Sequence, residues 1–205
     1  MIRIGITGNI GAGKTTVGKI FQSFGASFFD ADKIGHEILS HKNAKEKLLK
    51  SFGKEILTRK GEIDRKKLAQ KAFQSPQRQK IINRLTHPLI IKEIIRRTKG
   101  KGVAVIEASL LFESSLAERM DYIIWVSAPR KLKLKRAEKK YPDAEKRLLL
   151  QLKEGEGKRR ADFVLENKGS LSLLKKKALL IWERIVKSIP PQSLPPDIQK
   201  ASASL

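Results

Sequence analysis

The chain has 205 residues, of which 40% are hydrophobic and none is cysteine. This length and apolar content fit one compact domain with a buried core and exclude global disorder. The lack of cysteine excludes disulfides, thiol catalysis and the usual ligands of a structural zinc site. No apolar run approaches the roughly 18 residues that cross a bilayer, and the first residues lack a signal-peptide layout, so we expect a cytoplasmic protein without a membrane partner.

The formal net charge of +23 has two interpretations. A basic field concentrates polyanions, which would suit a nucleic-acid or membrane surface. Alternatively, a solvated, lysine-rich surface surrounds an enzyme that acts on anionic substrates. The cations are spread along the whole chain, and aromatic residues make up only 6% of it. The second interpretation is therefore favoured, and no specific nucleic-acid partner is expected.

Short apolar runs alternate with segments of helical spacing along the chain. The first run, Ile2 to Thr7, breaks at Gly8 and predicts a buried parallel strand. Further strands are expected at residues 26–29, 103–106, 122–126 and 163–165. Helices are expected at residues 14–24, from 33, from 44, from 65, and at 76–98, 130–140, 143–153 and 171–189.

This alternation predicts an α/β fold with a parallel sheet flanked by helices. The stretch from about 44 to 98 is helical without a strand, so we expect an insertion into a single domain that spans residues 1–188. Residues 189–205 contain four prolines and several serines and are expected to form a flexible tail.

A glycine-rich segment directly after the first strand matches the pattern G-x-x-x-x-G-K-T, which predicts a phosphate-binding loop. Glycines allow positive φ angles that turn backbone N–H groups toward phosphate oxygens, and the helix that begins there adds its partial positive charge. Lys14 can reach the outer phosphates, and the Thr15 hydroxyl can bind Mg²⁺. The expected ATP-binding residues are Gly8, Asn9, Ile10, Gly11, Ala12, Gly13, Lys14, Thr15 and Thr16.

Acidic residues follow two of the expected strands, where an open parallel sheet binds its ligands. Asp30 and Asp32 follow the second strand, and Glu107 follows the run VAVI. A carboxylate near the γ-phosphate can accept the proton of an acceptor hydroxyl or hold Mg²⁺ through water. Glu107 is similar to a Walker B acid. Asp30 and Asp32 are each either a helix cap or a functional carboxylate, with a general base favoured for Asp32.

Cations are dense between Arg130 and Arg147. They indicate either a solvated helix face or a closing lid whose guanidinium groups meet the transferred phosphoryl group. His36 and His41 are expected on a helix surface, and His87 precedes Pro88 at an expected kink.

Taken in order, several short elements resemble the dephospho-CoA kinase family, from Met1 to about Gly169. They are TGNIGAGKTT, FDADKIGHEIL, GEIDRKKL, LTHPLI, SLLFE and, toward the end, Arg147, Gln151, Ala161-Asp162 and Asn167-x-Gly169. None of these six elements is specific for the family alone, but their occurrence in the correct order is.

The resemblance implies transfer of the ATP γ-phosphoryl group, with Mg²⁺, to the ribose 3′-hydroxyl of dephospho-CoA, the last step of coenzyme A biosynthesis. It implies a nucleoside-monophosphate-kinase-like P-loop fold with a lid at about 130–150 and a helical acceptor-binding insertion. Asp32 would be the base, and Lys14 and Arg136 would neutralise charge during transfer. Arg65 and His87 would line the acceptor side, and Thr15 and Glu107 would hold the metal.

The chain departs from the family pattern at three positions. Ser109 stands where the family often has proline, and Glu107 stands where it usually has aspartate. Lys140 stands where the family often has a second lid arginine, so the two-pronged donor set of arginine is lost at position 140. Two rival functions remain: phosphorylation of another small nucleoside or nucleotide, and a nucleic-acid-stimulated ATPase activity. The second lacks a helicase-type or recognition-helix signature.

Overall fold

The computed structural model describes residues 1–139 and 141–188. The predicted tail at 189–205 and the lid position Lys140 lie outside the described residues. The chain divides into two compact units: one contains Met1–Asp30 and the chain from Thr98 onward, and the other is Ala31–Arg97. The smaller unit begins 13 residues before the expected insertion start at 44, since α2 (Ala31–Leu39) belongs to it.

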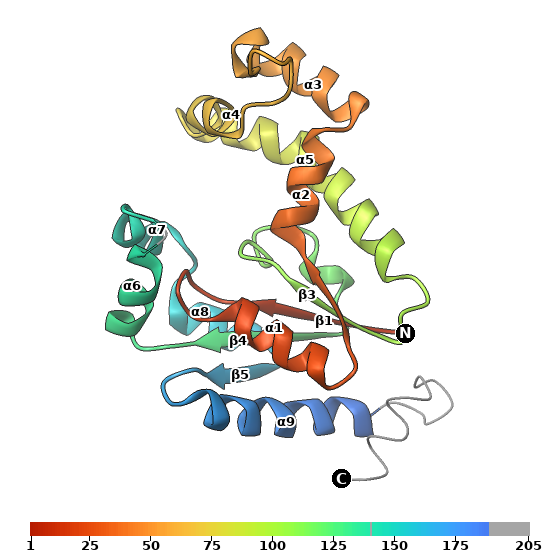
Figure 1. Cartoon of the computed structure of the whole chain (residues 1–205), viewed down its shortest axis with the longest axis vertical. Coiled ribbons are helices and arrows are strands. Elements are labelled where there is room, and N and C mark those ends of the chain that lie inside the picture. Colours follow the sequence, from red (N-terminus) through yellow and green to blue (C-terminus); the bar gives the residue numbers. More distant parts are fainter. Residues whose placement is uncertain (140, 189–205) are drawn as a thin grey trace. The chain divides into compact units, whose positions relative to one another are not determined.

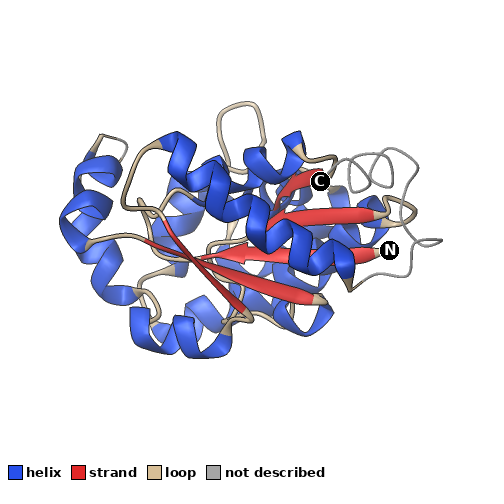
Figure 2. Ribbon diagram, turned by 90° about the horizontal axis from the view of Figure 1, so that it is seen from below, coloured by secondary structure: helices blue, strands red, loops and turns tan. Residues whose placement is uncertain are grey.

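The larger unit is built on a sheet of five parallel strands in the order β2-β3-β1-β4-β5. Helices lie on both faces of this sheet (Figure 2). Parallel strands need such cover because the crossover helices pack against the faces and bury the strands on both sides. The predicted α/β class is therefore confirmed. The strands are β1 (Ile2–Thr7), β2 (Ser27–Asp30), β3 (Val103–Glu107), β4 (Tyr122–Ser127) and β5 (Phe163–Glu166).

The helices divide between the units (Figure 1). In the larger unit they are α1 (Lys14–Ser23), α6 (Arg130–Glu138), α7 (Ala144–Leu150), α8 (Glu154–Arg160), α9 (Leu171–Lys187) and the 3₁₀ turn η2 (Ala117–Arg119). In the smaller unit they are α2, α3 (Lys42–Phe52), the 3₁₀ turn η1 (Lys54–Ile56), α4 (Arg65–Ala72) and α5 (Pro76–Thr98), of which only Thr98 belongs to the larger unit. Among the described residues, no helix is both long and apolar enough to span a bilayer.

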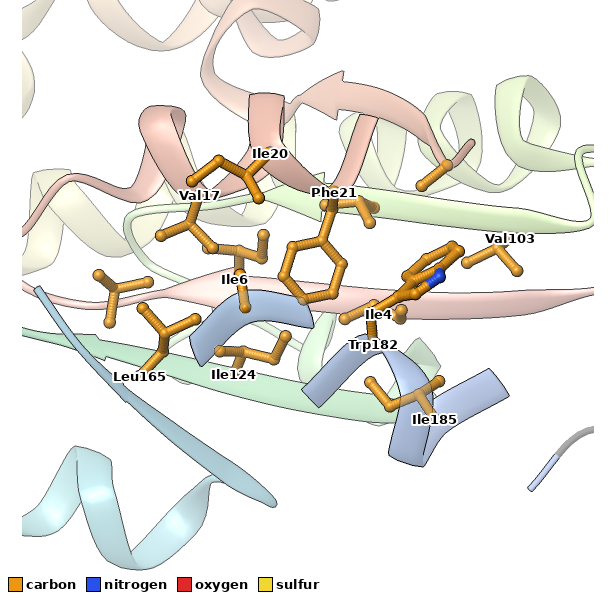
Figure 3. Packing of buried hydrophobic residues seen from close by; sticks show 14 of the residues in the cluster. Ile4, Ile6, Val17, Ile20, Phe21, Val103, Ile124, Leu165, Trp182 and Ile185 are labelled. Atoms are coloured by element: carbon orange, nitrogen blue, oxygen red, sulfur yellow. The ribbon is translucent and has the colours of Figure 1, made fainter. Parts of the chain in front are cut away.

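One face of the sheet packs against α1 and α9 (Figure 3). Phe21 from α1 and Trp182 from α9 meet edge to face, with ring centroids 5.8 Å apart. Both rings lie in a cluster with Ile4 of β1 and Ile124 of β4, whose side chains are fully buried. Aromatic pairs of this geometry add stability beyond the apolar area that they bury. This packing fixes the start of α1, and with it the end of the predicted phosphate loop.

The opposite face is covered by α8 and by the loop that follows β3. Trp125 follows Ile124 on β4 and therefore points to this second face. Its ring stacks on Phe112, with centroids 6.3 Å apart. A Cβ on Gly157 of α8 would lie only 2.3 Å from the same ring, so α8 approaches the sheet at a position where only glycine fits.

The smaller unit has its own core, formed by Leu48, Phe52, Ile56, Leu68 and Ala72. Asp64 caps α4, since its side chain accepts hydrogen bonds from the amides of Lys66 and Lys67. Glu93 of α5 binds Arg96 and Arg97, and Arg97 also binds Glu37 of α2 at 2.6 Å. These contacts hold α2 and α5 together within the unit.

Two expectations for the region after β4 were wrong. The helix expected to end at Lys153 ends at Leu150, and α8 was not predicted. Two glycines at residues 155 and 157 weakened the helical pattern there, although Gly157 is required by its contact with Trp125. The short extended segment from Gln151 to Lys153 between α7 and α8 lies beside the loop that follows β1.

Candidate functional site

The segment between β1 and α1 forms a loop at the carboxyl end of the sheet. Gly8, Gly11 and Gly13 have φ angles of 143°, 72° and 96°, a region that side chains rarely adopt. Gly13 directly precedes α1, so the first amides of this helix and its partial positive charge face the loop. Such a loop can bind a phosphate group through backbone N–H groups.

The same glycines also let three other chain segments approach the loop closely. A Cβ at Gly8 would lie 2.4 Å from the carbonyl oxygen of Val126 in β4. At Gly11 it would lie 2.0 Å from the carbonyl oxygen of Lys133 in α6, and at Gly13 2.2 Å from Nδ2 of Asn167 after β5. A side chain at any of these positions would push the loop off its support.

Lys14 is buried at the start of α1, with only 8% of its surface exposed. Its Nζ donates to the carbonyl oxygens of Gly8 at 3.0 Å and Asn9 at 3.3 Å. The ammonium group is thus held by the loop itself, where a phosphate chain wrapped by the loop would meet its charge.

Thr15 and Glu107, which the sequence placed in one metal site, do lie together. The Thr15 hydroxyl donates to Oε1 of Glu107 at 3.0 Å. The sheet register explains this proximity, because Glu107 lies opposite Ile6 of β1 on one side and Asp30 of β2 on the other. Oxygen ligands of this kind suit Mg²⁺. Among the described residues, no group of three or more His, Cys, Asp or Glu side chains could hold a metal ion.

Arg136 of α6 reaches the loop through Asn167. Its guanidinium group donates to the backbone oxygen and Oδ1 of Asn167, both at 3.4 Å. Asn167 in turn donates from Nδ2 to the carbonyl oxygen of Ala12 at 2.8 Å. One predicted lid arginine therefore lies at the loop, beside Gly13. Asn167 was noted in the Asn167-x-Gly169 element, but its role was missed because its partner Ala12 is 155 residues away in the sequence.

A buried polar network on the other side of the loop was also missed. Lys133 is 5% exposed, and its Nζ donates to Oδ1 of Asn9 at 3.0 Å and forms an ion pair with Glu154. Burial alone would raise the pKa of Glu154, but hydrogen bonds from Lys133 and Ser127 lower it overall. In the sequence, Lys133 was one of many cations in a basic run, and nothing marked it as buried.

A cavity of about 670 Å³ opens beside this network. Its volume is in the range typical of small-molecule sites. The charged residues that line it are Arg130, Lys133, Lys153, Glu154, Lys158, Glu166 and Lys168, so cations outnumber carboxylates.

The residues expected on the acceptor side belong to the smaller unit. Asp32 lies exposed in the first turn of α2, one residue after the unit begins. Arg65 is the first residue of α4, and His87 lies half-buried within α5. Burial lowers the pKa of His87, so its neutral form is favoured. Their roles stay predictions.

The chain is similar to known proteins over most of its length. The family model for dephospho-CoA kinase matches residues 2–172. The chain is 37% identical to the dephospho-CoA kinase of Aquifex aeolicus over 91% of this chain and 99% of that protein. It is 34% identical to that of Corynebacterium diphtheriae, over 91% of this chain and 98% of the relative. The structure of dephospho-CoA kinase from Campylobacter jejuni has a TM-score of 0.69 and 28% identity, and the match covers 91% of this chain and 98% of that one. A match over most of its length, together with the phosphate loop, places the chain in the dephospho-CoA kinase family.

Proposed function

We propose that this protein transfers the γ-phosphoryl group of ATP to the ribose 3′-hydroxyl of dephospho-CoA, giving coenzyme A and ADP. The observation that carries the proposal is the glycine-rich loop with Lys14 and the Thr15–Glu107 pair, within a chain of this family. A loop that wraps a triphosphate and a hydroxyl–carboxylate pair at its end are what a phosphoryl transfer from ATP requires. The cytoplasm is the proposed location.

The proposed reaction is a direct in-line transfer. The 3′-hydroxyl oxygen forms a bond to the γ-phosphorus, the bond to the β-phosphate oxygen breaks, and the hydroxyl proton passes to the Asp32 carboxylate. Arg65 and His87 would contact the acceptor. The remaining work is positioning and charge neutralisation, to which Lys14, the loop amides and Arg136 contribute.

A magnesium ion fits the residues at the carboxyl end of β3. Magnesium keeps several waters and takes only a few protein oxygens alongside substrate phosphates, so a hydroxyl and one carboxylate suffice. Thr15 Oγ1 and Glu107 Oε1, 3.0 Å apart, would provide these oxygens. When bound, the ion supplies positive charge that neutralises the phosphate oxygens.

The test is the reaction itself. Purified protein is incubated with ATP and dephospho-CoA, and the acceptor is followed by mass spectrometry together with ADP release. The expected result is a gain of one phosphoryl group by dephospho-CoA, with one ADP formed for each CoA. For comparison, a panel of nucleosides and nucleotides is offered as acceptors in the same assay. Faster phosphorylation of one of these acceptors than of dephospho-CoA would overturn the proposal.

A further inference from the structure

The segment between α7 and α8 contacts the phosphate loop through two hydrogen bonds. Oε1 of Gln151 accepts from the amide of Ile10 at 2.8 Å. The carbonyl oxygen of Leu152 accepts from Nδ2 of Asn9 at 3.0 Å. The residues that meet here are more than 140 positions apart in the chain, and the role proposed above for the loop makes no use of Gln151.

The hydrogen bond from Ile10 fixes one particular peptide group. In a trans peptide the N–H and the C=O point in opposite directions. The peptide that joins Asn9 to Ile10 has its N–H on Gln151, and its carbonyl oxygen accepts from Lys14 Nζ at 3.3 Å and from the amide of Ala12 at 3.1 Å. Holding the N–H on Gln151 therefore directs the carbonyl toward the ammonium group of Lys14.

The neighbouring residues cannot replace this restraint. Gly11 packs against the backbone of Lys133, but glycine rotates freely about its own φ and ψ, so it does not fix the peptide before it. The side chain of Asn9 is held by Lys133 and Leu152, which leaves the orientation of the next peptide open. Gln151 holds the N–H of this peptide, while the Ala12 amide and Lys14 hold its carbonyl oxygen.

We propose that Gln151 is a positioning residue for nucleotide binding, which acts through the Ile10 amide on the Asn9 carbonyl and Lys14. The inference rests on the proposed function in so far as the loop binds the triphosphate of ATP. It places a determinant of ATP affinity at the end of α7, within one residue of the segment expected to form the lid. Because the contact is made to the phosphate loop, the proposal predicts an effect on ATP binding and none on acceptor binding.

The experiment compares Gln151→Leu, which keeps the size but removes the acceptor oxygen, with Gln151→Glu, which keeps an oxygen at the same reach. Gln22→Leu, at an exposed position on α1, is the matched control. Binding of the non-hydrolysable analogue AMP-PNP is measured by titration calorimetry, and KM for each substrate by ADP release. Gln151→Leu is expected to weaken AMP-PNP binding and raise the KM for ATP roughly tenfold, the range for a lost hydrogen bond that leaves its donor unpaired.

The other outcomes separate positioning from packing. The KM for dephospho-CoA is expected to change less than about twofold, and Gln151→Glu to recover most of the AMP-PNP affinity, since a carboxylate accepts more strongly than an amide. Wild-type affinity in Gln151→Leu would overturn the proposal. If wild-type protein left dephospho-CoA unchanged while the AMP-PNP difference persisted, the proposed acceptor would fail and the role of Gln151 would stand.

Discussion

Asp32 lies two residues beyond the end of β2, where the chain enters α2. If it accepts the proton of the 3′-hydroxyl, Asp32→Asn keeps the shape and removes the basic oxygen. We expect kcat to fall by about 10² to 10⁴, the usual contribution of a general base, with a small change in the KM for ATP. Steady-state ADP release measures both. Asp30→Asn is the neighbouring comparison and should lose much less; near-normal turnover of Asp32→Asn would remove the base assignment.

Arg136 contacts Asn167 through bonds of 3.4 Å, which are weak enough to be exchanged for a phosphate. An arginine that meets the transferred phosphoryl group typically contributes about 10³ to 10⁵ in rate. We therefore expect Arg136→Ala to lose kcat toward that scale in single-turnover measurements, with an unchanged thermal midpoint. Arg136→Lys retains the charge without the planar fork, so its kcat should lie between those of the wild-type protein and the alanine variant. A kcat loss below about tenfold in the alanine variant would contradict the role.

The sequence identified the residues whose chemistry follows from a local pattern. The glycines, Lys14 and Thr15 lie within eight consecutive positions, and Glu107 ends an apolar strand, so each could be located before the structure was known. Gln151, Lys133 and Asn167 could not be assigned a role in this way. Their partners in the loop lie more than 120 residues away, and the contacts depend on how the sheet brings distant segments together.

At the scale of elements, the strands were predictable because each is a short, buried apolar run. All five were predicted within one residue of their observed ends, and β2 is shifted by one residue along the chain. The region from Gln151 to Arg160 was not predicted, because two glycines obscure α8 and the break after Leu150 has no proline or capping signal. Packing against Trp125, a tertiary effect, decides that α8 forms there.

Helix α5 carries a pH-dependent contact in the smaller unit. Hydrogen bonds from Arg96 and Arg97 lower the pKa of Glu93 from 4.5 to about 2. Because the pKa of Glu93 in the folded state lies below its unfolded value, the stabilisation is complete above pH 4.5 and is lost as the pH falls toward 2. Glu93→Gln should therefore flatten the loss of unfolding free energy over that range, measured by urea titration at about pH 6 and about pH 3.

Glu46, exposed on α3 in the same unit, provides the control. Glu46→Gln should retain the wild-type dependence on pH. An unaltered dependence in the Glu93 variant would show that this contact is absent from the folded state in solution.

At the scale of the whole molecule, the net charge of +23 acts on every anion in solution. ATP and dephospho-CoA are anionic, so the field should raise their association rates, and salt should screen it. We expect the KM values to rise between about 0.05 M and 0.2 M salt, while RNA or single-stranded DNA leaves ATP hydrolysis without acceptor unchanged. Hydrolysis stimulated by nucleic acid at low salt would favour the rival function. The measurement is ADP release at both salt concentrations, with and without nucleic acid.

The support of the phosphate loop has a consequence for the synthesis of the chain. The loop lies between residues 8 and 15 and leaves the ribosome before residues 151 and 167, which hold its Ile10 amide and Ala12 carbonyl. Contacts of such separation form late and slow the search for the native state. A nascent chain can thus carry the complete motif before it can hold a nucleotide, and ATP would first stabilise the protein after residues 151 and 167 have been translated.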